Sequence, residues 1–474
     1  MRKHAVLVPG FVGFDVLGQL KYYAGVTRCF RKWREQRRDV CVHFFDNFPT
    51  ASVTLRAERL QRFIAKKVAR GEIAVGDELT LIGHSTGGLD IRCALDALSR
   101  SRTGSTIADD REPIANEELL AAVRRVVFIS VPQYGTNLAD YLVRFRPAVQ
   151  GIIHGLGAGL RINRSFASKL RRAFADRLPA PRAEVLLAIN DALNESDETS
   201  SEGETQLADE REARAMLALW LDHMARDFDA IEDLTSRPNG DRASKSPAHF
   251  SAAERAREVS AWQGVQTRSY ASRVRAHAVN GTALLGQLAA FAKPAALPAR
   301  LVYGVLHQSL VARLVPGDML ARLTLDLGPA LAAALAVHAR PSLLFEASYA
   351  LCADSAGPLC RPLDDASFAP HFQPLSGGAP IPSSEIAVSD NDGVVNTLSM
   401  LWPYDARDPG RHRAFLVEGD HADVIGHYRL QPDSPRAKSD RAYDAYDIFE
   451  SGVGFNDDDF ERLWKHIFEF AFST

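Results

Sequence analysis

The sequence has few cysteines, almost no net charge and no long apolar run. Its five cysteines are an odd number that does not fit the disulfide framework of a small secreted domain. Its 56 basic and 59 acidic residues give a formal net charge of −3, so the chain offers no basic field that would attract nucleic acid. No apolar stretch reaches the roughly 18 residues of a membrane-spanning helix. These absences exclude a disulfide-stapled domain and argue against nucleic acid as a partner.

Phosphate-binding loops and an export signal are also missing. Neither G-x-G-x-x-G nor G-x-x-x-x-G-K-[ST] occurs, and we expect no cofactor for catalysis. The first apolar run, residues 5–8, is too short for the core of a signal peptide and predicts a first core strand in a cytoplasmic protein. Cys352 and Cys360 either pair or remain two separate thiols.

The first 136 residues alternate short apolar runs with amphipathic segments, as in a parallel α/β sheet. Apolar residues recur at helical spacing within 52–70. With 46% hydrophobic residues in 474, the chain can bury a large core and carry insertions. We predict strands at residues 5–8, 40–45, 79–82 and 126–130, and helices at 52–70 and 89–98.

Two long stretches interrupt this alternation. Residues 137–262 and 273–383 change to helical spacing and are predicted to be helical cap insertions, the first of them a lid. Residues 263–272 are predicted to be a core strand between them. Residues 1–136 and 384–474 form the two parts of the core, the latter with strands at 386–388 and 415–417. The predicted fold class is α/β, with a mostly parallel central sheet flanked by helices and large helical caps.

Gly83-His84-Ser85-Thr86-Gly87 directly follows the predicted strand 79–82 and precedes the predicted helix 89–98. A serine at such a turn is held with its hydroxyl outward above the sheet, and the flanking glycines leave room where a side chain would clash. The position of the motif predicts Ser85 as a nucleophile; the alternative is an ordinary turn serine.

A serine nucleophile needs a base within hydrogen-bond reach, and the base needs an acceptor that fixes its tautomer. In hydrolases with a nucleophile elbow, an acid and then a histidine follow the serine along the chain. Asp392 follows the predicted strand 386–388, and His421 follows the predicted strand 415–417. We therefore predict Ser85, Asp392 and His421 as a catalytic triad.

Each partner has rivals. Asp390 lies two residues before Asp392, which is favoured because it stands at the tighter Asp-Gly turn. His412 precedes the last predicted strand and His427 lies well beyond its end, so His421 is favoured as the base.

Acyl transfer also needs hydrogen-bond donors for a developing oxyanion. The backbone N–H of Thr86, directly after the nucleophile, is predicted to be one. Phe11, in the loop Pro9-Gly10-Phe11-Val12-Gly13 after the first strand, is predicted to supply the second. The alternative is a glycine-rich turn without a catalytic part.

With these residues placed, the chain resembles the bacterial triacylglycerol lipases, in particular the calcium-dependent true lipases of the α/β-hydrolase superfamily. The likeness is segmental and does not extend over most of the two insertions. The family usually has a histidine where this chain has Pro9, and its caps are smaller. The segments that carry the likeness are Val6-Leu7-Val8-Pro9-Gly10-Phe11-Val12-Gly13-Phe14-Asp15, Tyr22-Tyr23-Ala24-Gly25, Leu81-Ile82-Gly83-His84-Ser85-Thr86-Gly87-Gly88, Ser130-Val131-Pro132 with Gly135-Thr136, and Asn391-Asp392-Gly393-Val394-Val395.

The resemblance implies the same triad and the same two oxyanion donors. It also implies a structural calcium ion close to the catalytic histidine, for which Asp423 is one candidate ligand. The alternative is that Asp423 is an ordinary loop carboxylate.

These observations predict a serine hydrolase of carboxylic esters, with a lipid or long-chain acyl ester as the favoured substrate. Alternatives on the same triad are a short-chain carboxylesterase, a polyester depolymerase or an acyltransferase, and an alternative of another class is a non-catalytic binding protein. The expected partners are the ester substrate and, transiently, a lipid interface. The resemblance gives secretion as the alternative to the cytoplasmic location predicted above.

Overall fold

The structure, a computed structural model, describes residues 1–144, 229–274, 342–359, 372–430 and 447–473 with short gaps within these ranges. The chain divides into two compact units. The first comprises Met1–Arg144, Phe228–Val279 and Ser348–Thr474, and the second comprises Phe145–Asp227 and Asn280–Ala347. The second unit lies almost wholly outside the described residues, so the sheet and the site belong to the first.

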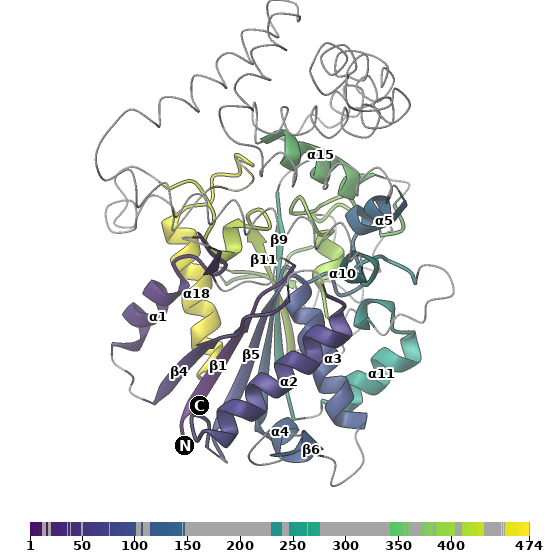
Figure 1. The fold of residues 1–474 in the computed structure, drawn as a ribbon. Helices are drawn as coiled ribbons and strands as arrows, with labels where there is room; N and C mark the ends of the chain where they lie inside the picture. Colours follow the sequence, from purple (N-terminus) through teal and green to yellow (C-terminus); the bar gives the residue numbers. More distant parts are fainter. Residues whose placement is uncertain are drawn as a thin grey trace, which may run out of the picture. The chain divides into compact units, whose positions relative to one another are not determined.

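A seven-stranded sheet forms the centre of the first unit, and every pairing within it is parallel (Figure 1). All six residues of its strand Lys3–Val8 are buried, because parallel strands are covered by helices on both faces and therefore have nearly continuous apolar sequences. From one edge to the other the strands are β10 (Phe372–Pro374), β11 (His412–Glu418), β9 (Gln266–Arg273), β8 (Val123–Ile129), β5 (Glu78–His84), β1 (Lys3–Val8) and β4 (Val40–Phe44).

Helices cover both faces of this sheet. Figure 1 shows α1 and α18 on one side and α2 and α3 on the other, and each pair is in contact. The described α-helices are α1 (Val26–Arg34), α2 (Val53–Ala69), α3 (Thr86–Arg100), α4 (Asn116–Ala122), α5 (Asn137–Arg144), α10 (Asp229–Glu232), α11 (Ala252–Ala261), α15 (Ser342–Ala353) and α18 (Asp457–Ala471). Short 3₁₀ turns and two-residue strands complete the described elements: η2 (Pro247–His249), η6 (Thr397–Met400), η7 (Asp423–Ile425), β2 (Val16–Leu17), β3 (Leu20–Lys21), β6 (Thr106–Ile107) and β7 (Ile114–Ala115).

Local capping explains where several helices begin. The Ser52 hydroxyl accepts the Leu55 N–H at the start of α2, and Ser251 and Glu254 form a reciprocal capping box at the start of α11. Asn456 caps α18, whose first turn contains three aspartates. These carboxylates suit the positive end of the helix dipole.

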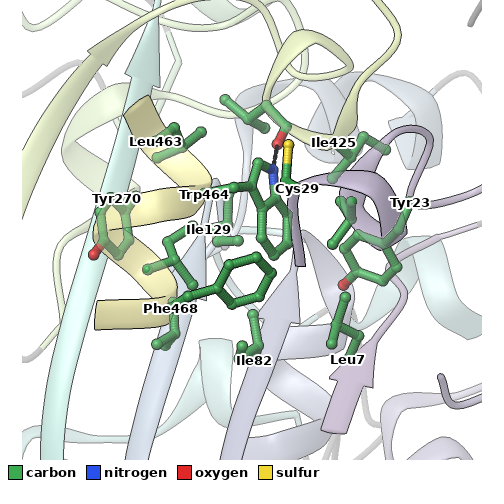
Figure 2. Packing of buried hydrophobic residues seen from close by; sticks show 14 of the residues in the cluster. Leu7, Tyr23, Cys29, Ile82, Ile129, Tyr270, Ile425, Leu463, Trp464 and Phe468 are labelled. Atoms are coloured by element: carbon green, nitrogen blue, oxygen red, sulfur yellow. Dashed lines mark hydrogen bonds between the residues drawn. The ribbon is translucent and has the colours of Figure 1, made fainter. Parts of the chain in front are cut away.

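The hydrophobic core next to α18 fixes the turn that follows β11. Trp464 and Phe468 of α18 pack against Ile82 and Ile129 of the sheet (Figure 2). The Trp464 indole N–H also donates to the backbone oxygen of Val424, at 3.0 Å. Because Val424 lies in the turn just after His421, α18 holds that turn through both packing and a hydrogen bond.

The parallel sheet, its two helical layers and the serine between β5 and α3 make this an α/β-hydrolase fold, as predicted. The predicted strands at 5–8, 40–45, 79–82, 126–130 and 415–417 are present, and β9 lies where the strand at 263–272 was expected. The predicted helices at 52–70 and 89–98 are α2 and α3. Most of both predicted caps lies outside the described residues, although α5, α10 and α11, within 137–262, belong to the first unit. Among the described residues, no helix has the length and apolarity needed to cross a bilayer.

The strand predicted at 386–388 is wrong. Asp390 closes a turn there: its N–H donates to the Ala387 oxygen at 3.0 Å, and its carboxylate accepts the Ala387 N–H at 3.1 Å. The edge of the sheet is instead β10, which pairs with β11.

Candidate active site

Ser85 occupies a strained turn between β5 and α3. Its φ of 53° lies in the left-handed region, which is costly for a residue with a Cβ atom. The turn is held by the Ser85 N–H, which donates to the Ile129 oxygen at 2.9 Å, and by the Gly88 N–H, which donates to the Ser85 oxygen at 3.0 Å. This is the geometry of a nucleophile elbow.

The glycines of the motif are required by close backbone contacts. A Cβ atom on Gly83 would lie 2.6 Å from the Gly88 nitrogen, and one on Gly87 would lie 2.3 Å from the Val8 oxygen. Both distances are far below an ordinary carbon contact, so the tight turn depends on glycine at these two positions.

Asp392 and His421 lie together beyond the carboxyl-terminal ends of the strands, at the same end of the sheet as Ser85. His421 Nδ1 lies 2.7 Å from Asp392 Oδ2, and the His421 N–H donates to the Asp392 backbone oxygen at 3.1 Å. A carboxylate can only accept, so His421 Nδ1 carries the proton, and in a neutral ring Nε2 keeps its lone pair. His421 thus has the tautomer of a general base.

The Asp392 carboxylate is fully buried and has four hydrogen-bond donors. Oδ1 accepts the N–H groups of Val394 and Val395 at 3.0 and 2.8 Å. Oδ2 accepts from His421 and from the Ser272 hydroxyl, both at 2.7 Å. Four donors match the acceptor capacity of an ionised carboxylate.

His84, the residue before Ser85, lies next to this pair. The His84 and His421 ring centroids are 4.7 Å apart. Among the described residues, the Ser85 hydroxyl has no hydrogen-bond partner, so its pairing with His421 Nε2 stays a prediction. Long catalytic hydrogen bonds are common before substrate binds.

The rival residues have other partners. Asp390 Oδ2 lies 2.9 Å from Arg273 Nη1. His412 is the first residue of β11, about 20 Å of extended strand before the turn that contains His421, and its Nδ1 lies 2.7 Å from Thr267 Oγ1. His427 is buried, and its N–H donates to the Ala422 oxygen. None of the three is hydrogen-bonded to Asp392.

The loop after β1 lies directly against the elbow. A Cβ atom on Gly10 would be 2.5 Å from Ser85 Cβ. The Gly10 oxygen accepts from Arg56 Nη2 at 2.8 Å. Since the peptide is planar and trans, the Phe11 N–H points away from Arg56. Gly10 is thus in van der Waals contact with Ser85. The predicted donor Phe11 is the next residue along the chain.

Thr86, the other predicted donor, is the first residue of α3. Its N–H has no carbonyl one turn earlier in the helix to accept it. The positive end of the helix dipole also favours negative charge at this position.

A buried ion pair holds the loop after β1. Arg56 and Asp90 are fully buried, with Nη2 2.9 Å from Oδ2. Arg56 Nη2 also donates to the Pro9 oxygen at 2.9 Å. Burial raises the pKa of Asp90 to about 6, although the Arg56 charge opposes this shift. Arg56 therefore holds this loop by its first two backbone oxygens, those of Pro9 and Gly10.

The described residues do not complete a calcium site. Asp423 Oδ2 accepts the Asp420 N–H at 2.8 Å, and Asp420 accepts the Ala422 N–H and the Ser451 hydroxyl. No group of three or more histidine, cysteine, aspartate or glutamate side chains in the described part of the chain could hold a metal ion. The calcium prediction at Asp423 stays a prediction, as does the cysteine pairing, because Cys360 lies outside the described residues.

Two serines behind Asp392 were not predicted from the sequence. The Ser272 hydroxyl that donates to Asp392 lies 2.6 Å from the Ser130 hydroxyl. Ser130, like Ser85, has a positive φ, of 50°. Ser130 stood in a segment of the family resemblance, but nothing local in the sequence indicates its partner 142 residues away.

No protein-family model matches this sequence, and no curated protein matches it. Among solved structures, the chain is similar to the Staphylococcus hyicus lipase, with 14% identity, 99% of this chain and 95% of that chain covered, and a TM-score of 0.41. It is similar to EstA from Clostridium botulinum, with 15% identity, 98% and 88% coverage and a TM-score of 0.36. It is also similar to lipase 1 from Pelosinus fermentans, with 14% identity, 96% and 98% coverage and a TM-score of 0.34. At these values the case for a function rests on the geometry of the site.

Proposed function

We propose that this protein is a serine hydrolase that cleaves carboxylic esters. The observation that carries the proposal is the 2.7 Å hydrogen bond between His421 Nδ1 and Asp392 Oδ2. It lies at the carboxyl-terminal end of the sheet, where Ser85 occupies the strained elbow. An acid, a base and a nucleophile that are far apart in sequence have little structural reason to gather there, whereas nucleophilic catalysis requires it.

Each residue has a role that follows from its environment. Ser85 attacks the ester carbonyl while His421 Nε2 takes its proton, and Asp392 holds the imidazole and stabilises its positive charge. The amides of Phe11 and Thr86 stabilise the negative oxygen of the tetrahedral intermediate. His421 returns the proton to the leaving alcohol, and water then hydrolyses the acyl-enzyme by the same steps.

A lipid or other long-chain acyl ester is the proposed substrate. Its support comes from the sequence: the segmental resemblance to true lipases, and the Ala- and Leu-rich composition of 137–262 and 273–383. Helical caps of this composition suit a lid that shields an apolar acyl pocket.

Covalent labelling tests the hydrolase. A fluorophosphonate should label the wild-type chain once, on the peptide that contains Ser85, and should not label Ser85→Ala. Ser99→Ala, which removes another serine of α3, should label like the wild type. A wild-type protein that is folded but neither labelled nor active on p-nitrophenyl esters of any chain length would be a binding protein instead.

A chain-length series tests the substrate class. Rates on esters of increasing acyl length should be measured below and above the solubility limit of each ester. A preference for long chains with a rate increase above that limit is expected. Preference for short soluble esters would identify an esterase, products formed with added alcohol an acyltransferase, and oligomers released from a polyester film a depolymerase.

A further inference from the structure

The segment 22–24 contacts residues directly beside three parts of the proposed site, although no step of the reaction uses it: the loop before Phe11, His84 before Ser85, and the turn after His421. The Tyr23 hydroxyl donates to the Val8 oxygen at 2.7 Å, at the end of β1. The Tyr22 hydroxyl lies 2.7 Å from the Gly10 nitrogen and 2.7 Å from His84 Nδ1. Gly426 packs closely against Ala24: a Cβ atom on Gly426 would lie 1.9 Å from the Ala24 oxygen.

The hydrogen bonds through Tyr22 and His84 form a chain with one possible direction. His84 Nε2 lies 3.0 Å from the His421 backbone oxygen, which can only accept, so Nε2 carries a proton. Burial first, and then the nearby His421, keeps the pKa of His84 well below its usual value, so the ring is neutral and Nδ1 is an acceptor. Tyr22 must therefore donate to Nδ1 and accept the Gly10 N–H.

This chain connects the two groups whose positions acyl transfer depends on. At one end it binds the Gly10 N–H, one peptide before the Phe11 amide. At the other end it binds the carbonyl of His421. Tyr22 and His84 are both buried, so water does not compete for these hydrogen bonds.

We propose that Tyr22 and His84 are positioning residues that hold the Phe11 amide and the His421 imidazole in register around Ser85. The proposal rests on the serine hydrolase function proposed above. Asp392 fixes the tautomer and the ring of His421 and accepts its backbone N–H, whereas His84 binds its backbone oxygen. Misplacement of a catalytic group by about 1 Å costs on the order of 100-fold in rate. Loss of the hydrogen bonds through Tyr22 and His84 should therefore affect kcat more than KM.

Three variants and one matched control test this. Tyr22→Phe removes the hydroxyl and should lower kcat about tenfold. His84→Leu removes both ring nitrogens and should lower kcat about 100-fold, whereas His84→Gln, whose amide can both accept and donate, should stay within about fivefold of the wild type. Tyr270→Phe is the control, because Tyr270 is another buried tyrosine whose hydroxyl lies 2.8 Å from a histidine, Nδ1 of His466 in α18.

The outcomes separate the proposals. With an active wild-type enzyme, a kcat within twofold of wild type in folded Tyr22→Phe, equal losses in His84→Gln and His84→Leu, or an equal loss in Tyr270→Phe would overturn the positioning role. If His84→Leu does not fold, Tyr22→Phe and His84→Gln still decide. A wild-type protein without fluorophosphonate labelling would refute the hydrolase itself, which is a different result.

Discussion

Gly10→Ala should lower kcat strongly by moving the loop after β1, which contains the proposed oxyanion donor Phe11. A Cβ atom at Gly10 would lie 2.5 Å from Ser85 Cβ, 2.7 Å from the Tyr22 hydroxyl and 2.8 Å from the His84 backbone oxygen. An ordinary contact begins at 3.4 Å, so the loop must retreat by about 0.9 Å. Two of the three neighbours belong to the elbow, whose turn is fixed by backbone hydrogen bonds. The loop is therefore the part that moves.

The size of the effect follows from what the loop supplies. Losing one oxyanion donor costs roughly 100- to 1,000-fold in kcat, or about 3–4 kcal/mol of transition-state stabilisation. Overpacking should lower the free energy of unfolding by about 1–3 kcal/mol. Gly10 does not have a positive φ, so alanine adds no backbone strain. Steady-state kinetics on a soluble ester, with a thermal melt of the same sample, measure both quantities.

Gly264→Ala is the matched control for this substitution. Nothing lies within 4 Å of a Cβ atom at Gly264, and its φ is not positive. Its kcat and melting temperature should match those of the wild type. A folded Gly10→Ala protein with a kcat within threefold of wild type would refute the placement of the oxyanion hole beside Gly10.

Four further predictions concern the groups around the site and the core. Arg56→Met leaves the buried Asp90 carboxylate unpaired and should lower the free energy of unfolding by about 3–5 kcal/mol in urea titrations; an unchanged midpoint would argue against the ion pair. Burial alone would raise the pKa of Asp77, but hydrogen bonds from the backbone and from His4 lower it to about 2. Because this lies below the unfolded value of 3.8, Asp77 should contribute roughly 2 kcal/mol of stability above about pH 4 that is lost as the pH falls toward 2, and Asp77→Asn should flatten that dependence. Ser272→Ala removes one donor to Asp392 and should lower kcat by about 10-fold with little change in KM, and an unaltered kcat would show that the donor is dispensable. Trp464→Phe leaves the Val424 oxygen without its indole donor and should lower the melting temperature in calorimetry, at a cost of about 1–3 kcal/mol.

Patterns within a few residues were enough to predict the centre of the sheet. The strands β1, β5 and β8 are buried on both faces over most of their length, so each contains a short run of mainly apolar residues, and the elbow directly follows β5. Asp392 and His421 were found because each follows an apolar run in the expected order. Only the second of those runs is a strand, so the structural reason for choosing Asp392 was wrong although its hydrogen bond to His421 is present.

Long-range partners could not be predicted in the same way. Residues 386–388 are apolar and two of the three are β-branched, yet the carboxylate of Asp390 binds the Ala387 N–H and Arg273, which replaces the hydrogen bonds of a strand with those of a turn. β10 was missed because it has only three residues and ends in a proline, which is tolerated at a sheet edge.

The supporting network shows the same limit. Tyr22 and His84 both lie in segments that carry the resemblance to bacterial lipases. The hydrogen bond between them, however, joins residues 62 positions apart. Arg56 lies on a helix with several other basic residues, and nothing in that pattern distinguishes the one whose partner Asp90 is buried 34 residues later. The Arg56–Asp90 pair is set by the packing of α2 against α3.

The proposed catalysis requires Ser85, His421 and Asp392 to act together beside the amides of Phe11 and Thr86. A crystal structure of the protein inhibited with an alkyl phosphonate tests it most directly. We expect a bond from Ser85 Oγ to phosphorus, with the phosphonyl oxygen about 2.7–3.1 Å from both amide nitrogens and His421 Nε2 facing Ser85 Oγ. A phosphonyl oxygen turned away from both amides, or a His421 ring rotated away from Ser85, would contradict it.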